Sequence, residues 1–284
     1  MGEARVRAPI PSSGYTPHAS HTGRTIVTSG RDTKTEKQDW RGVGRSVVEA
    51  ARLGLAGSRP PRYSVTLDQL FEARISSCLQ PGISVLDIGS GKLPTLGAGQ
   101  RPPGVRYVGL DASKDELDRA APGSYDETVV TDVAAHIPSL DERFDLVLSR
   151  YVLEHVKSMS AAMENVRRYL KPGGTMVSII PGAWAAFAVL NRVLPRRVSR
   201  GLMHMLHGRP EDTVFPAYYD RCSFSALQGT MASWTTSEVV PTFCAGYYFE
   251  FSRVVLALYL AYEEITYRRR WLNLAGHYLV VGTR

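Results

Sequence analysis

The sequence predicts an α/β protein built on a doubly wound, mostly parallel sheet. From Tyr63 onward, short apolar runs rich in β-branched residues alternate with segments of helical spacing, a pattern typical of parallel strands joined by helices. With 284 residues and 44% hydrophobic residues, the chain is long enough for one large α/β domain and too apolar to be wholly disordered. The three cysteines form no CxxC pair, so we expect neither a disulfide framework nor a zinc site.

The first five strands of the predicted sheet follow one another along residues 83–180. An amphipathic helix is expected over 64–80, where apolar residues recur at helical spacing before Pro81-Gly82 ends the helix. Two further helices fit between strands, one opened by a capping box at Ser113–Glu116 and one over 160–170, closed by Lys171-Pro-Gly-Gly174. The expected strands are 83–88, 105–110, 128–131, 144–149 and 175–180.

The remainder of the chain is expected to add helical insertions after the fifth strand and before the last one. Two late strands would form a sheet edge, as a hairpin whose arms are separated by a long helix. The expected elements are two apolar helices within 184–206, broken at Pro195, then a helix over 223–233, a strand over 237–242, a helix over 247–267 and a strand over 277–281.

Most of the net charge of +7 lies in residues 1–62, where basic residues outnumber acidic ones by about six. This segment is rich in Pro, Gly, Ser, Thr and Arg, so we interpret it as a disordered basic tail, with a short helix fitting 44–55. We expect a core over 63–182, a helical cap or acceptor region over 183–233, and strands and a long helix over 234–284 that complete the core. The nearly neutral body indicates no basic groove for nucleic acid.

Neither a secretory signal nor a membrane span is expected, because no apolar run reaches the roughly 20 residues that a span requires. We therefore expect a cytoplasmic protein. Arginines interleave with apolar residues over 183–210, which fits either peripheral contact with a membrane or a lipid-like acceptor, or a cap helix with a solvated face. These arginines are Arg192, Arg196, Arg197, Arg200 and Arg209.

A glycine-containing turn follows the first predicted strand, in the run Val85–Gly91. Its glycines would let the backbone pass close to a ligand, although a tight turn between strand and helix is the alternative explanation. Asp111 ends the next strand about 20 residues later, the separation at which a carboxylate meets ribose hydroxyls. Asp111 could instead be a solvated residue or a helix cap.

A dinucleotide is not the ligand that this turn favours. Pro94 stands where the third glycine of a dinucleotide fingerprint belongs, and only about a dozen residues separate Gly91 from the next strand. Little room remains for the helix whose N-terminus would face a pyrophosphate. A ligand with an amino acid and an adenosine but no phosphate fits better.

In these motifs the chain resembles the class I S-adenosylmethionine-dependent methyltransferases, and more narrowly their small-molecule, type 11-like group, which includes the quinone-type enzymes. The resemblance covers about residues 83–181 and implies a Rossmann-like fold. The matching segments are Asp87-Ile-Gly-Ser-Gly91, Asp111, Thr131-Asp132-Val133, Phe144–Ser149, Tyr151–Val156 and Leu170–Gly174.

The resemblance implies S-adenosyl-L-methionine as cofactor and assigns its methionine half to the first and fourth strands. Gly89 and Gly91 would lie under the methionine, and Asp87 would orient the loop and the amino group. The backbone at Ser149 and Arg150 would lie near the sulfonium. The implied cofactor-binding residues are Asp87, Gly89, Ser90, Gly91, Asp111, Ala112, Asp132, Val133, Ser149 and Arg150.

The adenosine half is assigned to the second and third strands. Asp111 would hold the ribose with Ala112 close to the adenine, and Asp132 would accept from the adenine amino group with Val133 nearby. The segment Leu93–Gly104 departs from the family pattern, because its three prolines leave no place for the usual helix after the glycine loop.

Catalysis of methyl transfer consists mainly of aligning the acceptor with the methyl group, and a base is needed only for an acceptor such as a hydroxyl. His155 is the first candidate for this base, followed by Tyr151 and Glu154; a packed structural role for His155 is the alternative. The aromatic cluster Pro216–Asp220 could line an acceptor pocket or belong to the core. His204 and His207, with Glu211 and Asp212 beyond them, do not make a convincing metal site, and we expect no metal.

The predicted function is S-adenosylmethionine-dependent methyl transfer to a small or lipid-like acceptor, at oxygen. Two alternatives stay open: a catalytically inactive cofactor-binding protein that acts through a partner, and a protein methyltransferase. Nucleic-acid methylation is disfavoured, because Ser149-Arg-Tyr-Val stands where exocyclic-amine enzymes carry an Asn/Asp-Pro-Pro-aromatic motif. The acceptor and the oligomeric state are not predicted.

Overall fold

A seven-stranded sheet forms the centre of the computed structural model, which describes residues 40–193 and 216–284. The chain divides into two units, Met1–Gln38 and Asp39–Arg284, and the second contains every element described below. The strand order is β3-β2-β1-β4-β5-β7-β6, and β7 runs antiparallel to the other six strands. The strands are β1 (Ser84–Ile88), β2 (Arg106–Asp111), β3 (Glu127–Val130), β4 (Phe144–Arg150), β5 (Leu170–Pro181), β6 (Thr236–Thr242) and β7 (His277–Thr283).

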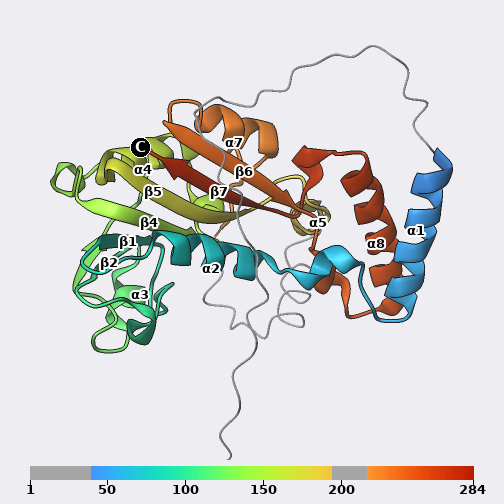
Figure 1. Ribbon diagram of the computed structural model, residues 1–284, viewed down its shortest axis with the longest axis horizontal. Helices are drawn as coiled ribbons and strands as arrows, with labels where there is room; N and C mark the ends of the chain where they lie inside the picture. The colour runs from blue at the N-terminus through green and yellow to red at the C-terminus, as the bar shows by residue number, and fades with distance from the viewer. Residues whose placement is uncertain (1–39, 194–215) are drawn as a thin grey trace, which may run out of the picture. The chain divides into compact units, whose positions relative to one another are not determined.

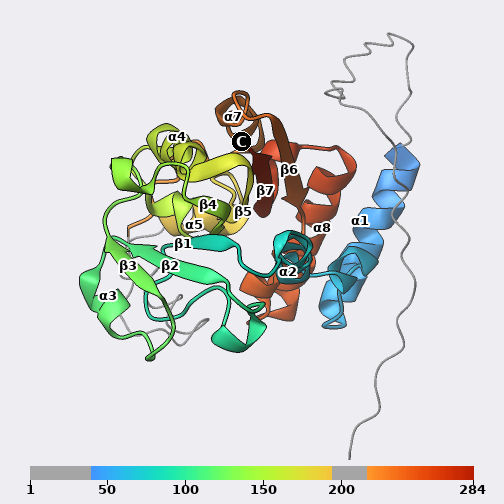
Figure 2. The ribbon, with the colours of Figure 1, turned by 60° about the vertical axis from the view of Figure 1, so that its left-hand side comes forward.

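Helices cover both faces of this sheet, which confirms the predicted doubly wound, mostly parallel fold. Phe71 and Ile75 of α2 pack on one face, whereas α4 and α7 cover the other (Figure 2). The helices in the described part of the chain are α1 (Trp40–Leu55), α2 (Leu67–Cys78), α3 (Lys114–Asp118), α4 (Met159–Tyr169), α5 (Ala186–Val193), α7 (Phe224–Thr230) and α8 (Arg253–Arg268). None of them is long and apolar enough to cross a membrane.

The central strands are short runs of buried apolar residues because helices lie on both of their faces. Val85, Leu86 and Ile88 of β1 are all buried. β6 forms the edge of the sheet, is more exposed, and carries Pro241, which an edge strand tolerates. β6 and β7 pair with each other across the intervening α8, as the predicted late hairpin required.

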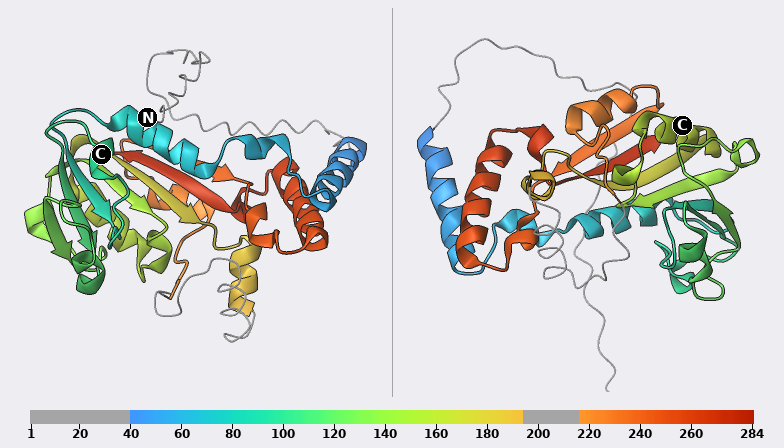
Figure 3. Two further views of the ribbon diagram at one scale, coloured as in Figure 1. Left: turned by 90° about the horizontal axis from the view of Figure 1, so that it is seen from below. Right: turned by 180° about the vertical axis from the view of Figure 1, so that it is seen from behind.

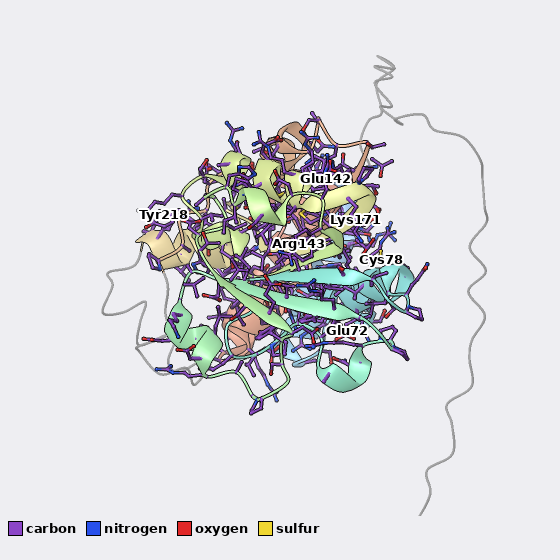
Figure 4. The ribbon with its side chains drawn as sticks, turned by 90° about the vertical axis from the view of Figure 1, so that its left-hand side faces the viewer. Glu72, Cys78, Glu142, Arg143, Lys171 and Tyr218 are labelled. Carbon is purple, nitrogen blue, oxygen red and sulfur yellow. The ribbon has the colours of Figure 1, made fainter. Side chains whose placement is uncertain are left out.

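The carboxyl ends of the parallel strands β1 to β5 meet at one edge of the sheet, which we call the carboxyl edge. Because β7 is antiparallel, its first residue, His277, also lies there, opposite Pro181 of β5. Figure 4 shows Tyr218 at this end of the strands, with Arg143 and Lys171 at the other end.

The structure differs from the sequence predictions mainly at the ends of elements. Helix α2 starts at Leu67 rather than 64, because Thr66 and Gln69 form a reciprocal capping box. The segment expected over 247–267 as one helix contains a 3-10 turn at Gly246–Phe249, and α8 then begins after its cap Ser252. As its prolines indicated, 93–104 contains only a 3-10 turn, at Ala98–Gln100.

The boundary placed at residue 62 is wrong for residues 40–62, which pack on the fold instead of belonging to a tail. Helix α1 lies beside α8 (Figures 1 and 3) and buries Ala50 and Gly54, whereas its larger apolar residues Val48 and Leu55 are exposed. A Cβ at Gly54 would lie 2.5 Å from the Cα atom of Ala257, so glycine permits this close approach. The packing face consists of small residues, which hydrophobic periodicity does not detect.

Candidate functional site

The glycine turn predicted as a ligand loop lies at the carboxyl edge, directly after β1. Gly89 and Gly91 both have positive φ, at 68° and 47°, in the left-handed region that glycine adopts without strain. A Cβ at Gly89 would also meet Val152, at 2.2 Å from one of its methyl carbons. The loop therefore needs glycine both for its backbone conformation and for close contact with the segment after β4.

Asp87 supports this loop from below and is fully buried. One carboxylate oxygen accepts hydrogen bonds from the Thr95 amide and the Tyr107 hydroxyl, and the other accepts from the Thr95 hydroxyl, each at 2.7 Å. Burial raises the pKa of Asp87 to about 6, and these hydrogen bonds oppose that rise. In this structure Asp87 connects the end of β1 to Thr95 and Tyr107, and its role toward the loop stays a prediction.

Three residues that sequence reasoning missed hold the proline-rich segment that replaces the usual helix. The Tyr107 hydroxyl accepts from the Leu96 amide at 3.0 Å, and the Arg101 guanidinium lies 3.6 Å from the centre of the Tyr107 ring. The Tyr125 hydroxyl donates to the Gly91 carbonyl at 2.9 Å. A tyrosine in a buried strand, such as Tyr107, was the one available signal, because its hydroxyl requires a partner.

Asp111 and Asp132 end neighbouring strands at the same edge. The Asp111 carboxylate is half-buried and accepts from the Ser113 amide at 2.8 Å. Burial raises its pKa, while the amides of Ser113 and Gly91 lower it. Asp132 is exposed and accepts from the Ala134 amide at 2.9 Å. The two carboxylates thus lie beyond adjacent strands, with Asp111 close to the glycine loop.

Their neighbours differ in exposure. Ala112 is exposed beside Asp111, whereas Val133 is buried in the core under the third strand, where its carbonyl accepts from the Asn165 amide group at 2.9 Å. Ser90, between the two glycines, is buried. An exposed and a buried apolar residue on adjacent loops suit the two sides of a partly enclosed planar ligand.

The end of β4 directs successive residues to different sides. Ser149 is buried on the α4 face, and its hydroxyl has no hydrogen-bond partner among the described residues. Arg150 is exposed and pairs with Asp68 of α2 at 2.8 Å. Tyr151 follows with φ of 58°, and burial raises the pKa of its hydroxyl. A left-handed conformation at a tyrosine is strained, and such strain is concentrated at functional sites.

His155 and Glu154 lie in a 3-10 turn, Leu153–His155, just beyond this point. The His155 Nδ1 atom is 3.1 Å from the Pro216 carbonyl, which can only accept, so Nδ1 carries the proton and Nε2 is the basic nitrogen. Nε2 lies 3.7 Å from Glu154 Oε1. Burial lowers the pKa of His155 and raises that of Glu154 to about 8, so both side chains are mainly neutral at pH 7.

The segment 216–220, expected either at an acceptor pocket or in the core, lies against this turn. The Tyr218 and Tyr219 amides donate to the Glu154 carbonyl, at 2.8 and 2.9 Å. Tyr219 is half-buried under the Arg192 guanidinium, whereas Tyr218 is exposed. The segment therefore contributes both to the core and to the surroundings of His155.

An aromatic cluster around His277, not anticipated from the sequence, lies at the same edge beyond β5. His277 is buried, its pKa is lowered to about 4 by burial, and its Nε2 atom is 3.2 Å from the Tyr247 hydroxyl. Phe187 and Tyr248 stack on each other at 4.1 Å, and the Tyr151 ring meets His277 edge-on. The members come from four separate segments, so no local pattern could reveal the cluster.

No group of three or more metal-ligating side chains occurs within residues 40–193 and 216–284. Several residues discussed from the sequence lie outside the described residues. They are Arg196, Arg197, Arg200, His204, His207, Arg209, Glu211 and Asp212.

Comparisons with known proteins bear on the identity of this edge. A family model described as a methyltransferase domain matches residues 59–227. A demethylmenaquinone methyltransferase from Symbiobacterium thermophilum is 30% identical over 108 residues, which cover 35% of this chain and 43% of the relative. A ubiquinone biosynthesis O-methyltransferase from Bradyrhizobium sp. is 34% identical over 121 residues, covering 41% and 47%. The chain thus spans less than half the length of these two curated relatives.

Among solved structures, phosphoethanolamine N-methyltransferase 2 from Haemonchus contortus is similar with a TM-score of 0.47 and 14% identity, over 76% of this chain and 52% of that one. The family model carries the assignment, because it matches more than half of the chain and includes β1 to β5 with the glycine loop. The resemblance seen in the motifs is confirmed, and the chain belongs to the class I S-adenosylmethionine-dependent methyltransferases.

Proposed function

We propose that this chain transfers a methyl group from S-adenosylmethionine to an oxygen of a small or lipid-like acceptor. One observation carries the proposal: the glycine loop, Asp111 and Asp132 gather at the carboxyl edge where His155 follows β4. Ligands of open α/β sheets bind outside the carboxyl ends of the strands. A cofactor-binding loop and a basic side chain thus share one edge.

The cofactor fits the residues present. The glycine loop and the half-buried Asp111 carboxylate lie side by side at the carboxyl edge, and this carboxylate can accept from both ribose hydroxyls. Asp132 is exposed where it could accept from the adenine amino group. We assign the methionine amino group to the loop that Asp87 orients.

S-adenosylmethionine supplies a methyl group activated by its positive sulfonium. The chain's own contribution is to align the acceptor and to remove its proton. His155 is placed for the second task, because its Nδ1–H is held by the Pro216 carbonyl and its basic Nε2 has a lowered pKa. A positioned base of this kind contributes about 100- to 10,000-fold. Tyr151 serves the first task, as part of the aromatic cluster.

The acceptor side is assigned to residues 183–233 together with the cluster around His277. Aromatic rings such as Phe187 and Tyr248 favour a planar or apolar acceptor. Trp184 and Val193, at either end of the α5 region, are exposed and would suit a lipid-like acceptor or peripheral contact with a membrane. The names of the curated relatives, which include quinone methyltransferases, support the same class.

Single-turnover transfer from isotopically labelled S-adenosylmethionine tests this proposal. The protein is incubated with polar and lipid extracts, and labelled products are separated by mass spectrometry. We expect a labelled small molecule, and His155→Gln should slow its formation by about 100- to 10,000-fold. His136→Gln is the matched control, because His136 pairs with Asp141 away from this turn. Labelled protein alone, or no labelled product, would contradict the proposal.

A further inference from the structure

Glu154 is the most deeply buried carboxyl group near the end of β4. Its side chain is 6% exposed, and its Oε2 atom has no hydrogen-bond partner in the described part of the chain. The Tyr218 and Tyr219 amides donate to its backbone carbonyl, so the segment at 216–220 is attached to the turn that carries Glu154. A buried carboxyl oxygen without a hydrogen-bond partner is costly and calls for an explanation.

Among the residues that the structure describes, no positively charged side chain contacts Glu154 at neutral pH. Burial raises the pKa values of Tyr151, Tyr219 and Cys222, and the nearby Glu154 raises them further. These three side chains therefore stay uncharged. His155, 3.7 Å away, has a lowered pKa and is mainly neutral. Arg192 faces Tyr219 rather than Glu154. The titratable and charged groups around Glu154 are Tyr151, His155, Arg192, Tyr219 and Cys222.

Glu154 also lies near the loop assigned to the methionine half of the cofactor. Val152, two residues earlier, is in contact with Gly89, as the 2.2 Å separation from a Cβ built there shows. The 3-10 turn that carries Glu154 begins with the next residue, Leu153. A short, tightly packed connection therefore links the glycine loop to this carboxyl group.

We propose that Glu154 is the counter-charge for the cofactor's sulfonium, a carboxylic acid without cofactor and a carboxylate when S-adenosylmethionine is bound. The inference rests on the proposed cofactor site at the carboxyl edge. A sulfonium carries a positive charge but no acidic proton, so a nearby carboxylate stabilises it by its negative charge. Glu154 meets this requirement because no side chain described here neutralises it first.

The role of Glu154 has a consequence for the reaction and for release of product. In the transfer, the new carbon–oxygen bond forms as the carbon–sulfur bond breaks, and the electron pair of that bond stays on sulfur. The positive charge is then gone, and the hydroxyl proton of the acceptor passes to His155 and on to Glu154, which becomes neutral again. Glu154 thereby favours the charged cofactor over the neutral thioether product.

Counting the protons released on binding tests the inference without any acceptor. Titration calorimetry is performed in buffers of different ionisation enthalpy at pH 7, with S-adenosylmethionine, with S-adenosylhomocysteine, and with sinefungin, which has an amine in place of the sulfonium. Because the pKa of Glu154 is about 8, most of the molecules carry its proton at pH 7. We expect the two cationic ligands to release most of one proton and the homocysteine product to release none.

The affinities give a second readout. If the positive charge lowers the pKa of Glu154 by about two units, Glu154 favours S-adenosylmethionine over the product about tenfold at pH 7, and more at pH 9. Glu154→Gln should remove both the proton release and this pH-dependent preference. Glu164→Gln, which changes an exposed carboxylate of α4, should keep both, and His155→Gln should keep the proton release.

The possible results separate this inference from the proposed function. If no ligand produces heat, the cofactor site itself is wrong. If all three ligands bind and the wild-type protein releases the same number of protons with each, Glu154 is not the counter-charge. That comparison needs no variant, so it stands even if Glu154→Gln does not fold. Proton release that persists in a folded Glu154→Gln protein would likewise overturn the assignment.

Discussion

Replacing Asp87 by asparagine should remove the negative charge of the side chain while keeping its hydrogen bonds. The introduced amide matches the carboxylate in shape: its oxygen can accept from the Thr95 amide and the Tyr107 hydroxyl, and its nitrogen can donate to the Thr95 hydroxyl oxygen. The loop should therefore keep its geometry, and only the buried negative charge is lost.

The magnitude follows from the pKa of Asp87, which burial raises from 3.8 to about 6. Between these values the folded protein holds a proton that the unfolded chain releases, so the contribution of Asp87 to stability falls as the pH rises from about 4 to about 6. About two pKa units correspond to about 3 kcal/mol. Relative to the wild type, Asp87→Asn should therefore gain about 3 kcal/mol in the free energy of unfolding between pH 4 and pH 7.

Urea unfolding at pH 4, 5, 6 and 7 measures this difference, because all other titrating groups are shared and cancel. Thr95→Val is the comparison: it keeps the carboxyl group but removes a hydrogen bond that lowers the pKa of Asp87, so its pH-dependent loss of stability should extend to higher pH than in the wild type. A difference between Asp87→Asn and the wild type that stays constant from pH 4 to pH 7 would refute the reasoning.

Two further predictions concern the packing of the segment before α2. Arg62, whose nitrogens lie 2.9 Å from Glu263 and 2.5 Å from Glu264, can be replaced by methionine. This leaves Glu263 buried without its cation and Glu264 paired with Arg268 alone, and should lower the free energy of unfolding by about 3–5 kcal/mol. Urea unfolding measures this loss, and a loss below about 1 kcal/mol would contradict the network. Removing residues 1–38 should leave Tm unchanged, whereas removing 1–60 should lower it by many degrees, because α1 then no longer covers α8; equal Tm values would contradict this packing.

The sheet could be predicted because its strands are short buried runs separated by clear breaks. The run Val85–Ile88 is buried on both faces and apolar except for Asp87, and Pro81-Gly82 marks its start. Helix α1 could not be placed in this way. Its contact with α8 relies on Ala50 and Gly54, whose small size permits close approach but produces no hydrophobic stripe.

The grouping of the proposed cofactor-binding residues at one edge was foreseeable because these residues lie at the ends of strands. Asp87, Asp111 and Asp132 each belong to or directly follow a strand, and parallel strands bring their ends together. The acceptor side was not foreseeable. The cluster around His277 joins segments far apart in the sequence, and the burial of Glu154 depends on a segment more than 60 residues later.

Titration of the folded protein with S-adenosylmethionine tests the central claim, that the cofactor binds at the carboxyl edge, most directly. Asp111→Ala should weaken binding by about 1.5–3 kcal/mol, which is about 10- to 150-fold, because it removes hydrogen bonds to a charged group. Asp118→Ala, which removes an exposed carboxylate paired with Lys114, should bind as the wild type does. Equal affinity of the folded Asp111→Ala variant and the wild type would contradict the account.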